Sequence, residues 1–342
     1  MKALLLKEIV DLSENHKPLA LEEIPIPVPK DNELLIQVAT CGICHTELDE
    51  IEGRTPPAFF PMILGHQAVG AVIKMGKNVT LHSVGDRVGV GWIFSACGQC
   101  EHCQNQNDNL CLNFKATGRD AYGGYAEKMC IPEQYAHRIP ESINNDQAAP
   151  LLCAGAIGYR SLMLTQVVNG QSIGLTGFGA SGHLVLKIAQ YLYPNSDIYV
   201  FARSPKEQEF AMSLGAIWSG HTETQSPELL HGIIDTTPAW KPVIKALENL
   251  RPGGRLVINA IRKEDDDKNL LGSISYVKHL WMEKEIKTVA NVSKLDIQNF
   301  LTLAAEAEIK PEIQAYQFNE INKALDELKN RKIRGAKILK II

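Results

Sequence analysis

Short apolar runs separated by Gly and Pro dominate the first third of the chain. Residues 34–38, 68–74 and 87–90 are examples, and each has the length and residue types of a β-strand. The Gly and Pro residues between them are typical of turns and long loops. This part of the chain therefore predicts a β-rich, barrel-like lobe.

The pattern changes after residue 170, where strand-like and helix-like segments alternate. Strands are expected at residues 172–176, 198–202, 233–235 and 255–259, and helices at residues 180–192 and 205–214. Ser204 is placed to cap the second helix and Gly215 to end it, and residues 251–254 form a turn. Such alternation predicts a doubly wound parallel sheet.

The chain is long enough for two domains, since it has 342 residues. After residue 290 helical patterns and a last strand at 337–342 are expected. We predict an α/β protein with a β-rich domain over residues 1–153 and 293–342. The parallel-sheet domain is expected over residues 154–292. The acidic run at 264–267 is predicted to be a solvated loop.

Charge and composition narrow the range of partners. The net charge is −4, from 35 Lys+Arg against 39 Asp+Glu, and no basic stripe recurs, so we expect no nucleic-acid partner. No apolar run approaches the roughly 20 residues of a membrane span, and residues 1–12 do not resemble a secretory signal. With cysteine-rich, metal-type motifs and no export signal, a reducing cytoplasm is the expected compartment.

Four of the cysteines, Cys97, Cys100, Cys103 and Cys111, have the spacing C-x2-C-x2-C-x7-C. Thiolates this close along the chain can surround one tetrahedral ion, and zinc suits an all-sulfur site. An iron–sulfur cluster is the main alternative, but its usual cysteine spacings are not present. Because four protein ligands leave no open position, we predict a structural zinc site.

Residues 177–182 read Gly-Phe-Gly-Ala-Ser-Gly between an expected strand and an expected helix. This is the context of a dinucleotide-binding, Rossmann-type loop, in which a helix N-terminus receives the pyrophosphate. The residues expected to bind the cofactor here are Gly177, Gly179, Ala180, Ser181 and Gly182. A purely structural turn is the alternative.

The residues after the second strand bear on which dinucleotide binds. An NAD site usually has an acidic residue about twenty positions after the loop, but Ala202, Arg203 and Ser204 stand there. A guanidinium can pair with a 2′-phosphate, so we favour NADP over NAD and assign Arg203 and Ser204 to cofactor binding. Alternatively, Arg203 is solvated or stacks on adenine.

Three further segments carry metal-type residues: Cys-Gly-Ile-Cys-His-Thr at 41–46, Gly-His-Gln at 65–67 and Leu-Leu-Cys-Ala-Gly at 151–155. Together they supply two thiolates and one imidazole, which would leave zinc a free position for water or substrate.

In combination these motifs resemble zinc-containing alcohol dehydrogenases of the medium-chain dehydrogenase/reductase superfamily. The resemblance runs nearly from end to end, includes residues 334–339, and is greatest to bacterial members with a phenylpropenol-dehydrogenase-like description. It implies a GroES-like catalytic domain, a Rossmann coenzyme domain, two zinc ions per chain and a homo-oligomer, dimer or tetramer.

The resemblance also implies roles for single residues. Cys44, His66 and Cys153 are the expected ligands of a catalytic zinc, whereas Cys41 is expected to be a packed thiol and Cys130 a core residue. Thr46 matches the hydroxyl that takes up the alcohol proton. His45 matches a residue that faces the coenzyme pyrophosphate. Trp92 matches an aromatic residue of the substrate pocket, although it could equally fill the core.

The chain departs from the family pattern at several positions. Gln67 replaces a glutamate after the zinc histidine, and Glu47 replaces an aspartate. Asp49 stands where a histidine often ends the proton relay, so it is either a relay group or an ordinary surface acid. Ala336 replaces an arginine, which leaves Arg334 as the candidate for that pyrophosphate contact.

The expected activity is hydride transfer between a nicotinamide cofactor and a primary alcohol/aldehyde pair. A secondary-alcohol or polyol dehydrogenase is one alternative, which Cys153 disfavours because those relatives often use a carboxylate as third ligand. Complete metal sites disfavour a zinc-free quinone reductase. A non-catalytic zinc- and dinucleotide-binding, redox-responsive protein is the alternative from another class.

Overall fold

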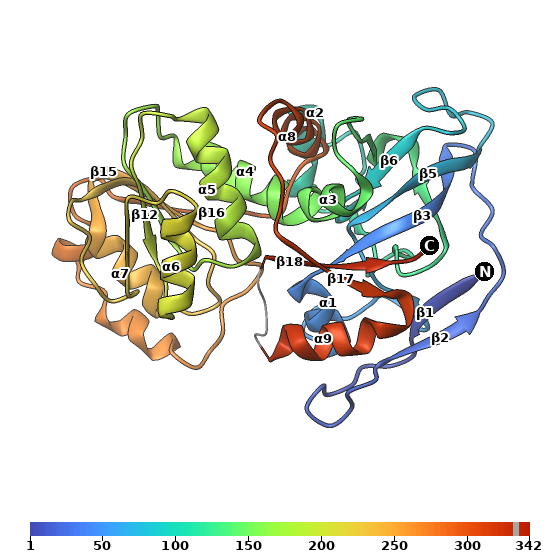
Figure 1. The fold of residues 1–342 in the computed structure, drawn as a ribbon, viewed down its shortest axis with the longest axis horizontal. Coiled ribbons are helices and arrows are strands. Elements are labelled where there is room, and N and C mark those ends of the chain that lie inside the picture. The colour runs from blue at the N-terminus through green and yellow to red at the C-terminus, as the bar shows by residue number, and fades with distance from the viewer. Residues whose placement is uncertain (331–334) are drawn as a thin grey trace. The chain divides into compact units, whose positions relative to one another are not determined.

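The structure, a computed structural model, describes residues 1–330 and 335–342 (Figure 1). They divide into two compact units, Met1–Ala156 with Val292–Ile342, and Ile157–Asn291. These bounds lie close to the domain bounds expected from the sequence.

The first unit is built around a seven-stranded mixed sheet in the order β10-β6-β5-β3-β18-β17, with β9 also paired to β3. Its strands are β3 (Glu33–Ile43), β5 (Ala68–Met75), β6 (Arg87–Val90), β9 (Lys128–Pro132), β10 (Ala136–Arg138), β17 (Ile313–Gln317) and β18 (Ala336–Lys340). Strand β3 is central because it pairs with β5, β9 and β18. Apolar side chains of β3 such as Leu34, Ile36 and Val38 are buried in the core of this unit.

Smaller elements complete the first unit. They are the sheet β2-β1-β4 (Leu19–Glu23, Lys2–Leu6, Met62–Ile63), the pair β7 (Ile93–Ser95) and β8 (Lys115–Ala116), and the helices α1 (His45–Ile51), α2 (Glu101–Gln104), α3 (Asn145–Pro150), α8 (Lys294–Glu306) and α9 (Ile321–Lys329). Short helical turns include η1 (Asp108–Leu110) and η3 (Leu151–Gly155). Strands and short helices alternate with long loops, as the apolar pattern predicts.

The second unit contains a six-stranded parallel sheet in the order β13-β12-β11-β14-β15-β16. The strands are β11 (Ile173–Thr176), β12 (Ile198–Phe201), β13 (Trp218–Gly220), β14 (Leu230–Asp235), β15 (Leu250–Ile258) and β16 (Glu285–Thr288), and the helices are α4 (Ala156–Thr165), α5 (Ala180–Leu192), α6 (Pro205–Ser213) and α7 (Lys241–Asn249). The strand order reverses between β11 and β14, so the carboxyl ends of these strands form the edge where such sheets bind ligands. The predicted doubly wound sheet is therefore confirmed.

Two local predictions in this unit need adjustment. The predicted turn at 251–254 lies within the bounds of β15, but these four residues interrupt its pairing with β14, which runs from Leu230–Leu250 to Gly232–Arg255. The acidic run is not wholly solvated. Asp267 is half-buried and accepts the backbone N–H groups of Trp240 (3.0 Å) and Lys241 (2.8 Å) at the start of α7.

One continuous helical stretch, Asn145–Thr165, has the length and composition of a membrane span, with a mean hydropathy of 1.2. The sequence-based expectation that no apolar run approaches the length of a membrane span is therefore wrong for this stretch. Within the protein 61% of the stretch's most apolar window is buried, and long core helices of soluble proteins meet the same criteria. The stretch is therefore weak evidence for a membrane segment.

Candidate functional site

Cys44, His66 and Cys153 lie together in the first unit, with their potential ligand atoms all within 4.8 Å of one another. Cys44 precedes α1, His66 lies between β4 and β5, and Cys153 lies in the short π-helical turn η3. His66 Nε2 is 3.3 Å from Cys153 Sγ. Two thiolates and one imidazole are a suitable donor set for zinc, and three ligands leave one tetrahedral position open.

A buried carboxylate, Glu47, orients this cluster. Its Oε1 is 2.6 Å from His66 Nδ1, and its other oxygen accepts the backbone N–H of Cys44 at 2.7 Å. Both Glu47 and His66 are fully buried. A carboxylate at this distance from Nδ1 favours a proton on Nδ1 and leaves Nε2 for the cluster, which is the usual arrangement of a metal-binding histidine. Sequence analysis missed this contact, although Glu47 has the capping-box spacing from Cys44.

The same contacts shift the pKa values of the three candidate ligands in different directions. A hydrogen bond from Cys153 lowers the pKa of Cys44 well below its usual range. His66 lowers it further, and both effects outweigh burial, which acts in the opposite direction. Burial opposes the charged imidazolium, but Glu47 and Cys44 raise the pKa of His66 well above its usual value. The hydrogen bond with Cys44 and burial raise the pKa of Cys153 well above its usual range, so Cys153 and His66 each have to give up a proton when zinc binds.

The other residues expected near this cluster lie in different surroundings. Thr46 Oγ1 is 3.6 Å from Cys44 Sγ, whereas the side chain of His45 is exposed. Asp49 is only 3% exposed and pairs with Arg54 Nε at 2.6 Å, so it is not an ordinary surface acid. Its role as a relay group stays a prediction.

Trp92 is a core residue of the first unit, 9% exposed. Its ring centroid is 5.1 Å from that of Phe114, and the guanidinium of Arg119 lies 5.3 Å from the indole. Trp92 therefore packs in the core of the first unit, and its role in the substrate pocket stays a prediction. Cys41 is fully buried, as expected, and Cys130 is half-buried on β9, where burial raises its pKa to about 12.

A second buried acid, Glu50, was not singled out from the sequence. It is fully buried on α1, and neither carboxylate oxygen has a hydrogen-bond partner among the described residues. Burial and the negative charge of Glu47 raise the pKa of Glu50 well above its usual value. Gln67, which directly follows His66, is also buried. The local spacing of residues does not predict the burial of either side chain, because burial depends on contacts with distant parts of the chain.

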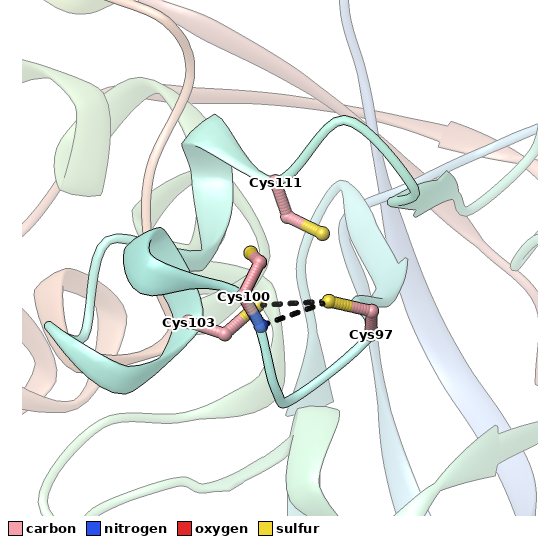
Figure 2. Close-up of side chains that lie close together, drawn as sticks. All are labelled: Cys97, Cys100, Cys103 and Cys111. Carbon is pink, nitrogen blue, oxygen red and sulfur yellow. Dashed lines mark hydrogen bonds between the residues drawn. The ribbon is translucent and has the colours of Figure 1, made fainter.

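The four cysteines of the other motif also converge, with all potential ligand atoms within 4.8 Å (Figure 2). Cys97 Sγ lies 3.9 Å from Cys103 Sγ and accepts the backbone N–H of Cys100 at 3.4 Å. Backbone N–H groups of Gln99 and Cys100 lower the pKa of Cys97 to about 6. All four thiols are free, and such N–H donors stabilise thiolates, so the arrangement fits a closed zinc site.

The glycine loop joins β11 to α5 in the second unit. Gly177 has φ +80°, which favours glycine, and Gly179 is the N-cap of α5, where an added Cβ would meet nothing within 4 Å. A Cβ on Gly182 would lie 2.7 Å from the carbonyl oxygen of Gly177. The first glycine thus makes a sharp turn, the second leaves space for a ligand to approach the backbone, and the third allows close contact between helix and loop. Dinucleotide-binding loops use their three glycines in this order. Ala180 and Ser181 form the first turn of α5.

Two residues after β12, Arg203 and Ser204, were expected to bind the cofactor. Arg203 is exposed and has no ion-pair partner in the described part of the chain. Ser204 Oγ accepts the N–H of Glu207 at 3.2 Å, and the Glu207 carboxylate accepts the N–H of Ser204 at 3.3 Å. Ser204 therefore caps α6, as predicted. Arg334 lies outside the described residues.

The carboxyl edge of the sheet holds polar groups that the sequence did not indicate. Asp235 ends β14 and is fully buried, where it pairs with Lys263 and accepts the hydroxyl of Thr176 at 2.6 Å. Asn259 directly follows β15, is 7% exposed, and its Nδ2 has no partner among the described residues. These groups come from the ends of three different strands or the segments after them, so only the sheet register brings them to one edge.

A β-rich unit with two cysteine-containing clusters that could each hold a metal ion, and a parallel sheet with a glycine loop at its switch point, are features of a metal-dependent dehydrogenase. The alcohol dehydrogenase GroES-like domain family matches residues 30–141. A probable alcohol dehydrogenase, AdhA, of Mycobacterium tuberculosis (strain CDC 1551 / Oshkosh) is 36% identical over 95% of this chain and 93% of its own length. A mannitol dehydrogenase of Petroselinum crispum is 30% identical, over 89% of this chain and 92% of its own length.

The solved structures lead to the same family. A cinnamyl alcohol dehydrogenase of Sorghum bicolor superposes with a TM-score of 0.85 at 26% identity, covering 99% of this chain and 97% of that one. The chain belongs to the zinc-containing alcohol dehydrogenases of the medium-chain dehydrogenase/reductase superfamily.

Proposed function

We propose that this protein is a zinc-dependent, NADP-preferring dehydrogenase acting on a primary alcohol/aldehyde pair. The observation that carries the proposal is the cluster of Cys44, His66 and Cys153, with the buried Glu47 behind the histidine. In this proposal Met1–Ala156 with Val292–Ile342 form the catalytic domain, and Ile157–Asn291 form the coenzyme domain.

Zinc in this cluster would supply a Lewis acid for the substrate oxygen. Glu47 holds the Nδ1 proton of His66, so Nε2 stays available as a ligand. The hydroxyl of Thr46, beside Cys44, accepts the proton of the substrate alcohol and donates its own outward. Asp49, three residues further along α1, is the proposed next acceptor.

The relay is tested by replacing Thr46. Thr46→Ala should lower kcat for alcohol oxidation about 10²-fold or more while zinc content is unchanged, and Thr46→Ser should restore most of the activity because it keeps the hydroxyl. Equal activity of the alanine and serine variants would contradict this role.

The NADP preference rests on Arg203, which is exposed after β12 where an NAD-binding acid is missing. Turnover of one aldehyde should be compared with NADPH and with NADH in the zinc-loaded protein. We expect Arg203→Ala to raise KM for NADPH about tenfold or more and to leave KM for NADH unchanged, because only NADPH carries the 2′-phosphate. Lys206→Ala, also exposed, is the matched control. An NADH preference in the unmodified protein would overturn the cofactor assignment alone.

The substrate class rests on the relatives and on the third metal ligand. The sorghum relative is described as a cinnamyl alcohol dehydrogenase, which suggests an aromatic aldehyde as first substrate. The parsley relative is described as a mannitol dehydrogenase, so a polyol belongs in the same assay. A higher kcat/KM for a polyol or secondary alcohol than for any aldehyde would favour the alternative. No turnover at all in zinc-loaded protein would favour the non-catalytic alternative.

We further propose two zinc ions per chain, one in each cysteine-containing cluster, which metal analysis of the purified protein can count. The cytoplasm is the proposed compartment, since all eight cysteines are free.

A homo-oligomer is also proposed, because β16 is an open sheet edge whose residues are all exposed. Beside it in the chain the apolar side chains of Tyr276, Val277 and Trp281 are exposed, as is typical of interaction surfaces. Light scattering coupled to size-exclusion chromatography would show a dimer or tetramer, and a monomeric mass would contradict the proposal.

A further inference from the structure

A polar cavity of about 340 Å³ lies in the second unit, away from the glycine loop. Its lining includes Arg251, Arg255, His231 and Gln171, together with backbone of the Gly253–Gly254 turn. Neither the proposed reaction nor the predicted cofactor contacts use any of these residues.

The cavity lies at the amino ends of the parallel strands. His231 is the second residue of β14, Arg251 is the second residue of β15, and Glu285, which also lines the cavity, begins β16. The glycine loop follows the carboxyl end of β11. Because all these strands are parallel, the cavity and the dinucleotide loop occupy opposite edges of the sheet. A ligand in the cavity would therefore be distinct from the dinucleotide.

The tautomer of His231 is determined by its neighbour Ser172. The backbone N–H of Ser172 donates to His231 Nδ1 at 3.1 Å, so Nδ1 is an acceptor and the neutral ring carries its proton on Nε2. This Nε2 contacts Nη1 of Arg251. Two N–H donors therefore meet at the cavity without an acceptor between them. Burial and the charge of Arg251 lower the pKa of His231, which favours the neutral ring.

The charges around these donors leave one cation uncompensated. Arg255 donates Nε and Nη2 to Glu285 at 3.0 and 2.7 Å and Nη1 to the carbonyl of Leu164 at 3.0 Å, so all its nitrogens are engaged. Arg251, in contrast, has no carboxylate partner among the described residues. An oxyanion would satisfy both converging donors and compensate the charge of Arg251, because guanidinium groups bind phosphate oxygens through paired N–H donors.

We propose that this cavity binds a small phosphate monoester, with Arg251 and the Nε2–H of His231 donating to the phosphate oxygens. The volume exceeds what inorganic phosphate alone requires, so an organic group of a few atoms is accommodated beside the phosphate. This site is independent of the proposed dehydrogenase activity.

Calorimetric titration of the full-length, zinc-loaded protein tests the proposal. Inorganic phosphate and glycerol phosphate are the probes, chloride at equal ionic strength is the salt control, and saturating NADPH occupies the dinucleotide site. We expect saturable binding of both phosphates in the millimolar range, tighter for the monoester. Arg251→Gln should weaken it about tenfold or more, since a charge-assisted hydrogen-bond donor is lost.

Two further variants control for misfolding and for phosphate binding at the dinucleotide site. His231→Gln should also weaken binding, which guards against misfolding of the Arg251 variant. Arg203→Ala should leave binding unchanged, because Arg203 lies at the opposite edge of the sheet. Equal phosphate binding by the unmodified protein and by both cavity variants, or equal heats with chloride, would overturn the proposal. Phosphate binding that is seen without NADPH and disappears when NADPH is added would assign the binding to the dinucleotide site instead.

Discussion

Gly179→Ala should separate cofactor binding from stability in the glycine loop. An alanine Cβ at this position meets nothing within 4 Å, and the backbone φ is −100°, a value that alanine adopts. The folded protein can therefore accept the methyl group. Replacing glycine also reduces the conformational freedom of the unfolded chain, so we expect the free energy of unfolding to rise by about 0.4–1 kcal/mol.

Cofactor binding should change in the opposite direction. Gly179 is the N-cap of α5, so the methyl group occupies the approach of the pyrophosphate to the helix N-terminus. Losing one charge-assisted hydrogen bond costs about 1.5–3 kcal/mol. Since about 1.4 kcal/mol is tenfold in affinity, the Kd for NADPH should rise about 10- to 100-fold. Isothermal titration with NADPH and thermal unfolding of the same preparations measure the two effects.

Gly182→Ala is the matched control, because its Cβ would lie 2.7 Å from the carbonyl oxygen of Gly177. Overpacking of this kind costs about 1–3 kcal/mol, so Tm should fall in this variant and not in Gly179→Ala. An unchanged Kd for NADPH in Gly179→Ala, with Tm retained, would refute the assignment of this loop to the pyrophosphate.

Three further predictions concern the first unit. Glu47→Gln should weaken zinc binding by the cluster with His66 about 10- to 100-fold, because a carboxylate that orients a ligand is lost. Zinc release to a chromogenic chelator measures this affinity, and an unchanged rate and extent of release would contradict the prediction. Cys97→Ser should remove one zinc ion per chain and lower Tm while leaving the other site loaded, and metal analysis showing no loss would exclude a zinc site there. Glu50→Gln should stabilise the protein by about 1–3 kcal/mol at pH 8, since burial raises the pKa of Glu50 and ionisation above its ordinary value of 4.5 opposes folding. The difference in the free energy of unfolding between Glu50→Gln and the unmodified protein should shrink toward zero as the pH falls to about 4, and parallel pH curves from urea unfolding would refute it.

Local chemistry made parts of this protein predictable from the sequence. The four-cysteine motif and the glycine loop are short, and each depends on residues within one turn or loop, so spacing alone brings their atoms together. The strand–helix alternation predicted the parallel sheet for a similar reason, because burial on both faces requires continuous apolar runs. Grouping Cys44, His66 and Cys153 required the family resemblance, since three separate segments supply them.

Contacts between distant segments were decided only by the tertiary structure. The pairing of Glu47 with His66 and the burial of Asp49 and Glu50 depend on how α1 packs in its unit. Residues 251–254, where a turn was predicted, lie inside β15 but are left out of its pairing with β14, which runs from Leu230–Leu250 directly to Gly232–Arg255. Strand register also brought Asp235 to Lys263 and His231 to Arg251.

The sequence by itself thus determined the ligand types, the loop chemistry and the order of the elements, because these follow from bonding and periodicity over a few residues. Which polar groups lose water, and which partner each then meets, was decided by the tertiary structure. Desolvation and long-range pairing depend on segments that only the folded chain brings together.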